Sequence, residues 1–215
     1  SAENFPVKHH LIKLAGKFAR KPFWGEERMD EKTLRSSLKA LNNYVKFIGT
    51  QEESVTIESI LEQTRLLNYR YGVNGLIVDP WNTIEHKYGD GENETNYISR
   101  VLSQLNTFAK VNEMHIWVVA HPRKMENDSD RKPVVPNPYD ISGSANWFNK
   151  CDNAITIHRH RNEFEDYVGV HVNKIRFQYK NGKPTIGKPP VKLNYNVGSG
   201  TYETYIEPVE ENLFR

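Results

Sequence analysis

An aspartate closes one apolar stretch of the chain, and its position suits nucleotide chemistry. Asp79 directly follows Leu76-Ile77-Val78, and Pro80 comes next. A short apolar run that stops at a proline is typical of a fully buried strand, so Asp79 stands at its carboxyl end. Ligands bind at that end of the strands in open α/β sheets, where a carboxylate can hold the Mg²⁺ of a nucleotide. An aspartate that caps the next loop is the alternative, and this stretch alone favours neither.

A second apolar stretch ends in a similar way and adds a histidine. Residues 115–120 predict another buried strand, which ends at His121 before Pro122. A helix is predicted between the two strands, so the unit is a right-handed crossover with parallel strands. We therefore expect Asp79 and His121 to lie side by side at one edge of a sheet.

The loop that leaves this second strand is basic. Its four cations are Arg123, Lys124, Arg131 and Lys132. They either form a solvated surface or contact the phosphates along a DNA strand. The position of the loop at the ligand-binding edge of the sheet favours the second interpretation.

Two further cations flank an isoleucine in a segment with strand character. Alternation puts Lys174 and Arg176 on one face of the strand and Ile175 on the other. Either this face is solvated, or the pair is aimed at phosphate in the manner of an arginine finger. Tyr195, near the end of a later strand, is either a packing residue or a platform for a base.

The pattern of a phosphate-binding loop, G-x-x-x-x-G-K-[ST], does not occur in the sequence. The chain by itself is therefore not expected to hold nucleotide phosphates tightly. No metal site is expected apart from Asp79. His158 and His160 would share a strand face, but no cysteine or carboxylate cluster completes them. Cys151 is interpreted as a small buried residue.

Composition limits the class of protein. The chain has 215 residues, a net charge of +2, 37% hydrophobic residues and one cysteine. A single cysteine excludes an internal disulfide and suits a reducing compartment. No apolar run is long enough for a membrane span and no signal peptide opens the chain, so we expect a cytoplasmic protein without membrane contact.

Periodicity predicts helices that alternate with strands, followed by a run of strands. Helices are expected at 7–18, 30–45, 56–67, 97–111 and 142–148, and strands at 76–79, 115–120, 154–158, 168–177, 190–196 and 201–206. Residues 45–48 are compatible with a further short strand. The fold class is therefore α/β, with a mostly parallel sheet flanked by helices and antiparallel strands toward the C-terminus.

Together these stretches resemble the RecA-core ATPase domain of DnaB-like hexameric replicative DNA helicases, a group that includes Twinkle and the phage primase–helicases. The chain resembles the Twinkle and phage type most, over nearly its whole length. The resemblance rests on the order and spacing of five motifs: Ser1-Ala2-Glu3-Asn4, Leu76-Ile77-Val78-Asp79, Val118-Val119-Ala120-His121-Pro122-Arg123-Lys124, Gly143-Ser144 with Cys151-Asp152-Asn153, and Lys174-Ile175-Arg176.

The resemblance implies a role for each motif in ATP hydrolysis. Glu3 would activate the attacking water, and Asp79 would be the Mg²⁺-associated acid. His121 would sense the γ-phosphate of ATP and couple it to DNA. Arg176 would be the arginine finger that reaches the nucleotide of a neighbouring subunit, with Lys174 as its companion.

The resemblance also implies ligand contacts outside the catalytic centre. Tyr195 falls where some members of the family stack on the adenine base. Gly143 and Ser144 belong to a DNA-binding loop, in which Ser142 stands where phage-type members can carry an arginine. DNA contact would therefore rest on Gly143, Ser144 and the cations of the basic loop, which are Arg123, Lys124, Arg131 and Lys132.

The implied protein is one RecA-like helicase core domain over residues 1–215, without its first strand and phosphate loop. Its cofactors would be ATP and Mg²⁺, and its partners single-stranded DNA and identical subunits in a hexameric ring. A primase domain in the same chain is a further expected partner, and the setting would be a bacterial or phage-infected cell. Two alternatives stay open: a non-catalytic module that binds single-stranded DNA, and another RecA-type ATPase such as a recombinase.

Overall fold

Six strands form two separate sheets in the part of the chain that the computed structural model describes, which is residues 6–49, 55–126, 134–143, 145–161 and 166–206. β1 (Gly75–Val78) and β2 (His115–Val118) pair in parallel. β3 (Asn153–Arg161), β4 (Asp166–Ile175), β5 (Val191–Asn196) and β6 (Thr201–Thr204) form an antiparallel sheet in chain order. The predicted α/β class is confirmed. The sheet was expected to be mostly parallel, however, and only one parallel pair occurs in the described residues, because β3 to β6 follow one another as hairpins.

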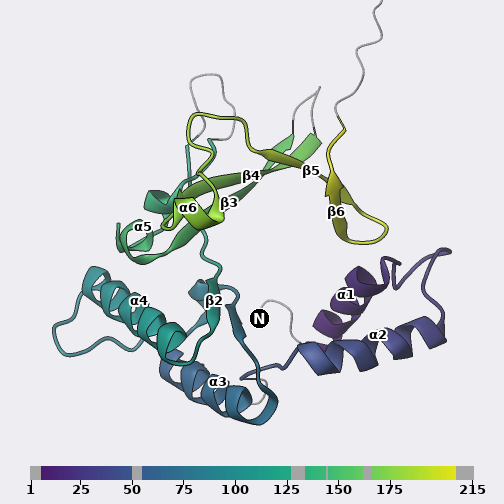
Figure 1. The fold of residues 1–215 in the computed structure, drawn as a ribbon, viewed down its shortest axis with the longest axis horizontal. Coiled ribbons are helices and arrows are strands. Elements are labelled where there is room, and N and C mark those ends of the chain that lie inside the picture. Colours follow the sequence, from purple (N-terminus) through teal and green to yellow (C-terminus); the bar gives the residue numbers. More distant parts are fainter. Residues whose placement is uncertain (1–5, 50–54, 127–133, 144, 162–165, 207–215) are drawn as a thin grey trace, which may run out of the picture.

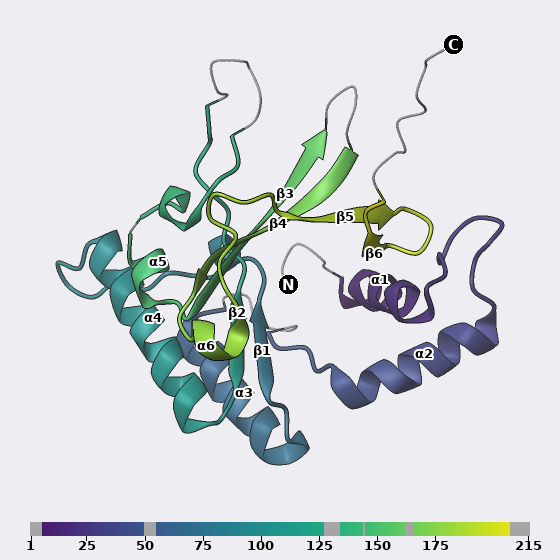
Figure 2. The ribbon, with the colours of Figure 1, turned by 45° about the horizontal axis from the view of Figure 1, so that its top comes forward.

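Two of the long helices pack on the parallel pair, and the other two pack on each other (Figures 1 and 2). Figures 1 and 2 show α3 (Ile57–Tyr71) and α4 (Glu94–Val111) side by side against β1 and β2. They also show α1 (Val7–Ala19) and α2 (Glu31–Tyr44) as a pair near the β5–β6 hairpin. The shorter helices are η2 (Trp81–Thr83), η3 (Pro138–Asp140), α5 (Asn146–Lys150) and α6 (Gln178–Asn181).

Side-chain caps set the helix starts, as the sequence predicts in two cases. The Asp30 carboxylate accepts the backbone N–H of Thr33 at 2.7 Å, and Thr56 forms a capping box with Ser59. Helix α4 begins three residues before its predicted start because Asn93 is its cap. The short strand considered at 45–48 is wrong: those residues form no strand, and the Val45 N–H bonds back to the end of α2.

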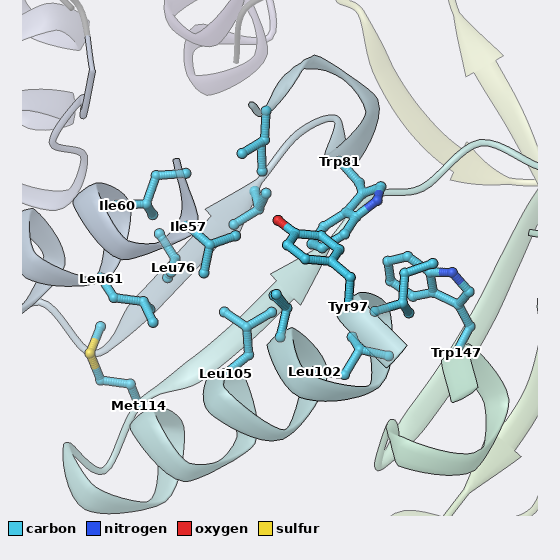
Figure 3. Close-up of a cluster of buried hydrophobic side chains, with 14 residues drawn as sticks. Ile57, Ile60, Leu61, Leu76, Trp81, Tyr97, Leu102, Leu105, Met114 and Trp147 are labelled. Atoms are coloured by element: carbon cyan, nitrogen blue, oxygen red, sulfur yellow. The ribbon is translucent and has the colours of Figure 1, made fainter. Parts of the chain in front are cut away.

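The hydrophobic core lies between α3, α4 and the parallel pair (Figure 3). Trp81 and Trp147 meet edge to face there, with ring centroids 5.1 Å apart. The buried members are Ile57, Ile60, Leu61, Leu76, Val78, Trp81, Ile84, Tyr97, Ile98, Val101, Leu102, Leu105, Met114 and Trp147. Strand β1 was expected to be buried on both faces, but Ile77 is 69% exposed, because α3 and α4 cover only the face that carries Leu76 and Val78.

Gly143, in the segment before α5, packs closely against the first two turns of α4. Its φ is +94°, and a Cβ at this position would lie 2.4 Å from the Ile98 Cδ1 and 2.8 Å from the Glu94 carboxyl carbon. The Gly143 carbonyl accepts a hydrogen bond from the Thr95 hydroxyl at 2.9 Å. Both the backbone conformation and the close approach therefore require glycine here.

Truncating a buried leucine should cost more free energy of unfolding than truncating an exposed leucine. We expect Leu105→Ala to lower the free energy of unfolding by about 2–4 kcal/mol, because Leu105 is 4% exposed and its loss leaves a cavity. Leu66→Ala is the matched control on α3, since Leu66 is 55% exposed, and it should cost less than about 0.5 kcal/mol. Urea unfolding of this chain measures both, and equal costs would contradict the assigned core.

A methyl group at Gly143 should destabilise the fold more than one at a comparable open turn. Gly91 has a φ of +70° with no atom within 4 Å of its Cβ position, so Gly91→Ala should cost only the strain of the left-handed backbone, about 1 kcal/mol. Gly143→Ala should cost about 2–4 kcal/mol, because Ile98 is buried and cannot move aside freely. Indistinguishable unfolding midpoints for the two variants would show that Gly143 is not packed as described.

Candidate functional site

The carboxyl ends of β1 and β2 lie together, as predicted. The register pairs Val78 with Val118, and two hydrogen bonds extend the pairing beyond the strands. The Val119 N–H donates to the Val78 carbonyl at 2.9 Å, and the Trp81 N–H donates to the Val119 carbonyl at 2.8 Å. Asp79 therefore follows the end of one strand, half-buried, and the exposed His121 follows the end of its neighbour.

A histidine that the sequence analysis did not connect with this edge lies within electrostatic reach of it. Burial lowers the pKa of His10 on α1, and the negative charge of Asp79 opposes that shift. The His10 ring also contacts the Phe47 ring edge-on, with centroids 5.3 Å apart. A charge interaction across nearly seventy residues of sequence has no local signal, so only the fold reveals it.

The basic loop is closed at its base by contacts with the segment that precedes α5. Pro122 and Ile141 form an antiparallel bridge, and the Arg123 N–H donates to the Asp140 carbonyl at 2.7 Å. The Arg123 guanidinium also lies 3.4 Å from the buried carboxylate of Asp140. The side chains of Arg123 and Lys124 remain exposed to solvent at the same end of the fold as His121.

Four of the predicted site residues lie outside the described residues. They are Glu3, Arg131, Lys132 and Ser144. Their predicted roles in water activation and DNA contact stay predictions.

Lys174 and Arg176 both turn toward the junction of α5 and β3. The Lys174 ammonium donates to the Phe148 carbonyl at 2.6 Å and to the Asn149 carbonyl at 3.2 Å, and it lies 4.9 Å from the centre of the Phe148 ring. The Arg176 guanidinium pairs with the Asp152 carboxylate at 2.8 Å. We call Phe148, Asn149, Asp152, Lys174 and Arg176 the α5–β4 corner.

A β-bulge explains why Lys174 reaches α5. Ala154 pairs with Lys174, but the next residue on β3, Ile155, pairs with Val172, so Asn173 is an extra residue in β4. One extra residue reverses the alternation of side chains along a strand. Lys174 therefore lies on the face of Ala154 rather than on the face of Val172, which simple alternation would give.

Tyr195 packs within the β5–β6 hairpin beside a polar cavity. Its ring lies 5.1 Å from the Tyr202 ring and stays 38% exposed. The residues of the following turn line a cavity of about 470 Å³ together with the connection between α1 and α2. The lining residues are Arg20, Lys21, Pro22, Glu27, Arg28, Asn196, Gly198 and Ser199, so none of the predicted catalytic residues contributes to it.

Among the described residues, no group of three or more histidine, cysteine, aspartate or glutamate side chains could hold a metal ion. His158 and His160 do share a strand face, with ring centroids 4.7 Å apart, and His171 joins them through a 3.2 Å contact to the His160 Nε2.

Burial raises the pKa of the Cys151 thiol. None of the helices in the described ranges is both long and apolar enough to span a membrane.

Comparison with known proteins identifies relatives of the whole described fold. No family model matches the chain. The sequence is 36% identical, over 186 residues, to the Twinkle homolog protein, chloroplastic/mitochondrial, of Arabidopsis thaliana. That alignment covers 82% of this chain but only 26% of the plant protein. The plant protein's name places it in organelles, so the cytoplasmic location expected for this chain stays a prediction.

The fold is similar to a solved DnaB-like replicative helicase whose interactions with primase were studied. The TM-score is 0.65 at 18% sequence identity, over 91% of this chain and 48% of the helicase chain. The chain thus spans a quarter to a half of the length of the proteins it matches. By sequence the chain is a relative of the Twinkle homologue, and its fold is that of a DnaB-like helicase domain.

Proposed function

We propose that this chain is part of a helicase motor that couples ATP hydrolysis at subunit interfaces to movement along single-stranded DNA. Residues 1–215 would form one core domain of a homo-oligomeric ring, with a primase as a further partner. The observation that supports this most is the parallel pair of strands whose ends carry Asp79 and His121, in a chain related to the Twinkle homologue.

The edge of the parallel sheet has the chemistry to hold Mg²⁺ and sense a phosphate. A half-buried carboxylate at a strand end offers the oxygen ligands that Mg²⁺ prefers, so Asp79 fits this role. Bound Mg²⁺ neutralises negative charge on the transferred phosphoryl group. Glu3 would orient the attacking water, and Tyr195 would stack on the adenine base.

The cation that stabilises the transferred phosphoryl group would come from a neighbouring copy of the chain. Within the described residues no ion pair joins Arg176 to Asp79. Arg176, directly after β4, instead pairs with Asp152, directly before β3. A site whose acid and cation lie on different sheets of one chain is completed most simply between two chains. Arg176, with Lys174 beside it, would supply this charge in trans.

His121 would connect the nucleotide to DNA. It stands between the strand end and the basic loop, which starts at Arg123 and returns at Asp140. Loss of the γ-phosphate would change the contacts of His121 and shift this loop, which is an order–disorder type of switch. Arg123, Lys124, Arg131 and Lys132 would then contact DNA phosphates, with Gly143 and Ser144 placing the neighbouring loop.

Mixing two inactive variants should restore ATP hydrolysis if the site is shared between subunits. We expect Asp79→Asn and Arg176→Ala each to lower the turnover of ATP by the full-length protein, and Arg176→Ala by about 10³-fold or more. In mixed oligomers, about a quarter of the interfaces would join an intact Asp79 to an intact Arg176, so activity should return to a comparable fraction of the wild-type rate. Steady-state ATP hydrolysis measures this.

Arg35→Ala is the matched control for these variants. Arg35 forms a similar exposed pair with Glu31 at 2.6 Å, but it lies on α2. Its loss should leave ATP turnover unchanged. If mixed rings form and no activity returns, the proposal of an arginine acting in trans is wrong. If neither single variant loses activity, Asp79 and Arg176 do not belong to the ATPase site.

The two described cations of the basic loop should contribute to DNA affinity through phosphate contacts. We expect Arg123→Ala with Lys124→Ala to weaken binding of single-stranded DNA by this chain and to reduce the slope of log K against log [salt] by about 1.4, at about 0.7 per phosphate contact. Fluorescence anisotropy at several salt concentrations measures both quantities.

A charge-matched control distinguishes loop contacts from a general effect of net charge. Lys32 and Lys39 are exposed on α2, and replacing both with alanine removes the same net charge. This control should leave the slope of the salt dependence unchanged. Equal losses of affinity in the two double variants would contradict a DNA interface at the loop.

A further inference from the structure

Asp152 holds Arg176 through both its side chain and its backbone. Its carboxylate oxygen Oδ1 lies 2.8 Å from the Arg176 Nη1, and its carbonyl accepts the Arg176 backbone N–H at 2.9 Å. The neighbouring carbonyl of Cys151 accepts a longer hydrogen bond from Nη2, at 3.5 Å. One short segment between α5 and β3 thus fixes the place of the arginine and the direction of its guanidinium.

We propose that Asp152 is the positioning residue for Arg176, which it orients toward the phosphates of a nucleotide on the neighbouring subunit. The inference rests on the proposed function of Arg176 as a cation acting in trans. It assigns to Asp152 no contact with the nucleotide itself.

The geometry leaves Arg176 able to bind phosphate while Asp152 holds it. A guanidinium carries five N–H groups in a fixed planar fork. The Asp152 carboxylate pairs with Nη1, and the Cys151 carbonyl accepts one N–H from Nη2. The side chains of Arg176 and Asp152 are 40% and 42% exposed, so solvent reaches the guanidinium while it is paired. Arg176 can therefore meet a phosphate without first giving up its partner.

The ion pair between Arg176 and Asp152 is not explained by a contribution to the stability of the fold. Exposed ion pairs contribute little to folding, because solvent screens them and both side chains lose conformational freedom. The benefit of the pair lies in orientation: an arginine already held in one rotamer loses less freedom when it binds phosphate. This is the usual effect of a residue that supports a catalytic group.

The segment that carries Asp152 is itself anchored. Lys174 bonds to the Phe148 and Asn149 carbonyls, which ties β4 to α5. The Lys150 ammonium bonds to the Ser99 carbonyl at 2.8 Å, which ties α5 to α4. The direction of Arg176 is therefore fixed relative to α4, the helix that also contacts Gly143 in the predicted DNA loop.

A double-mutant cycle on the full-length protein tests the proposal. We expect Asp152→Asn to lower the kcat of ATP hydrolysis about tenfold while the KM for ATP changes less than about twofold, because the contact acts on the transition state. In an Arg176→Ala background, Asp152→Asn should have no further effect on kcat. Asp152→Glu, which keeps the charge, should recover part of the loss.

The control replaces a comparable pair elsewhere in the same hairpin. Arg159 and Asp166 lie 2.8 Å apart and are similarly exposed. Asp166→Asn should leave kcat unchanged, and thermal unfolding of this chain should show equal midpoints for Asp152→Asn and Asp166→Asn.

Three results would overturn the proposal. An equal loss from Asp152→Asn in both backgrounds would mean that Asp152 acts through the fold rather than through Arg176. A rise in kcat would mean that Asp152 restrains Arg176 instead of orienting it. If Arg176→Ala keeps full ATP turnover, the proposed role of Arg176 is wrong, and this inference is wrong with it.

Discussion

The parallel pairing of β1 and β2 over a single apolar core is the constraint on which the rest of the structure depends. Leu76 and Val78 point into the core against α3 and α4, and they fix which face of β1 is buried. A slip of one residue would turn these side chains to solvent and turn Gly75, Ile77 and the charged Asp79 toward the core, so the register is strongly specified. The positions of Asp79 and His121 follow from that register, because each comes directly after or shortly after its strand.

Three cations of the candidate site, all in the described residues, each have a partner in their own chain. Arg123 pairs with Asp140, Arg176 pairs with Asp152, and Lys174 caps the carbonyls at the end of α5. Long cationic side chains in water sample many rotamers, which weakens any contact with a ligand. Here the partners narrow that sampling, and the side chains of Arg123 and Arg176 stay open to solvent. In the proposed function, these three cations would therefore be restrained before a nucleotide or DNA strand binds.

Local signals in the sequence made the helix starts and the order of the elements predictable. Contacts between residues far apart in the sequence could not be predicted in this way. The sequence predicted the caps at Asp30 and Thr56 and the order strand–helix–strand correctly, because these features depend on residues that are close together in the sequence. The exposed face at Ile77 was missed because an apolar run looks the same whether one or both of its faces are covered.

The candidate site shows the same division. The sequence placed Lys174 and Arg176 near each other but gave no sign of the bulge at Asn173 or of the partner Asp152. The charge interaction between Asp79 and His10 likewise exists only in the fold.

The separation of the acid from the cation has a consequence for how activity would depend on assembly. Asp79 belongs to the parallel sheet and Arg176 to the end of the antiparallel sheet, and no ion pair in the described residues joins them. An active site made within one chain would keep a constant turnover per chain on dilution. A site made between chains loses turnover per chain as the oligomer dissociates. If Asp152 orients Arg176 as proposed, assembly would only have to bring two preformed halves of the site together, and little further ordering would be needed before the reaction.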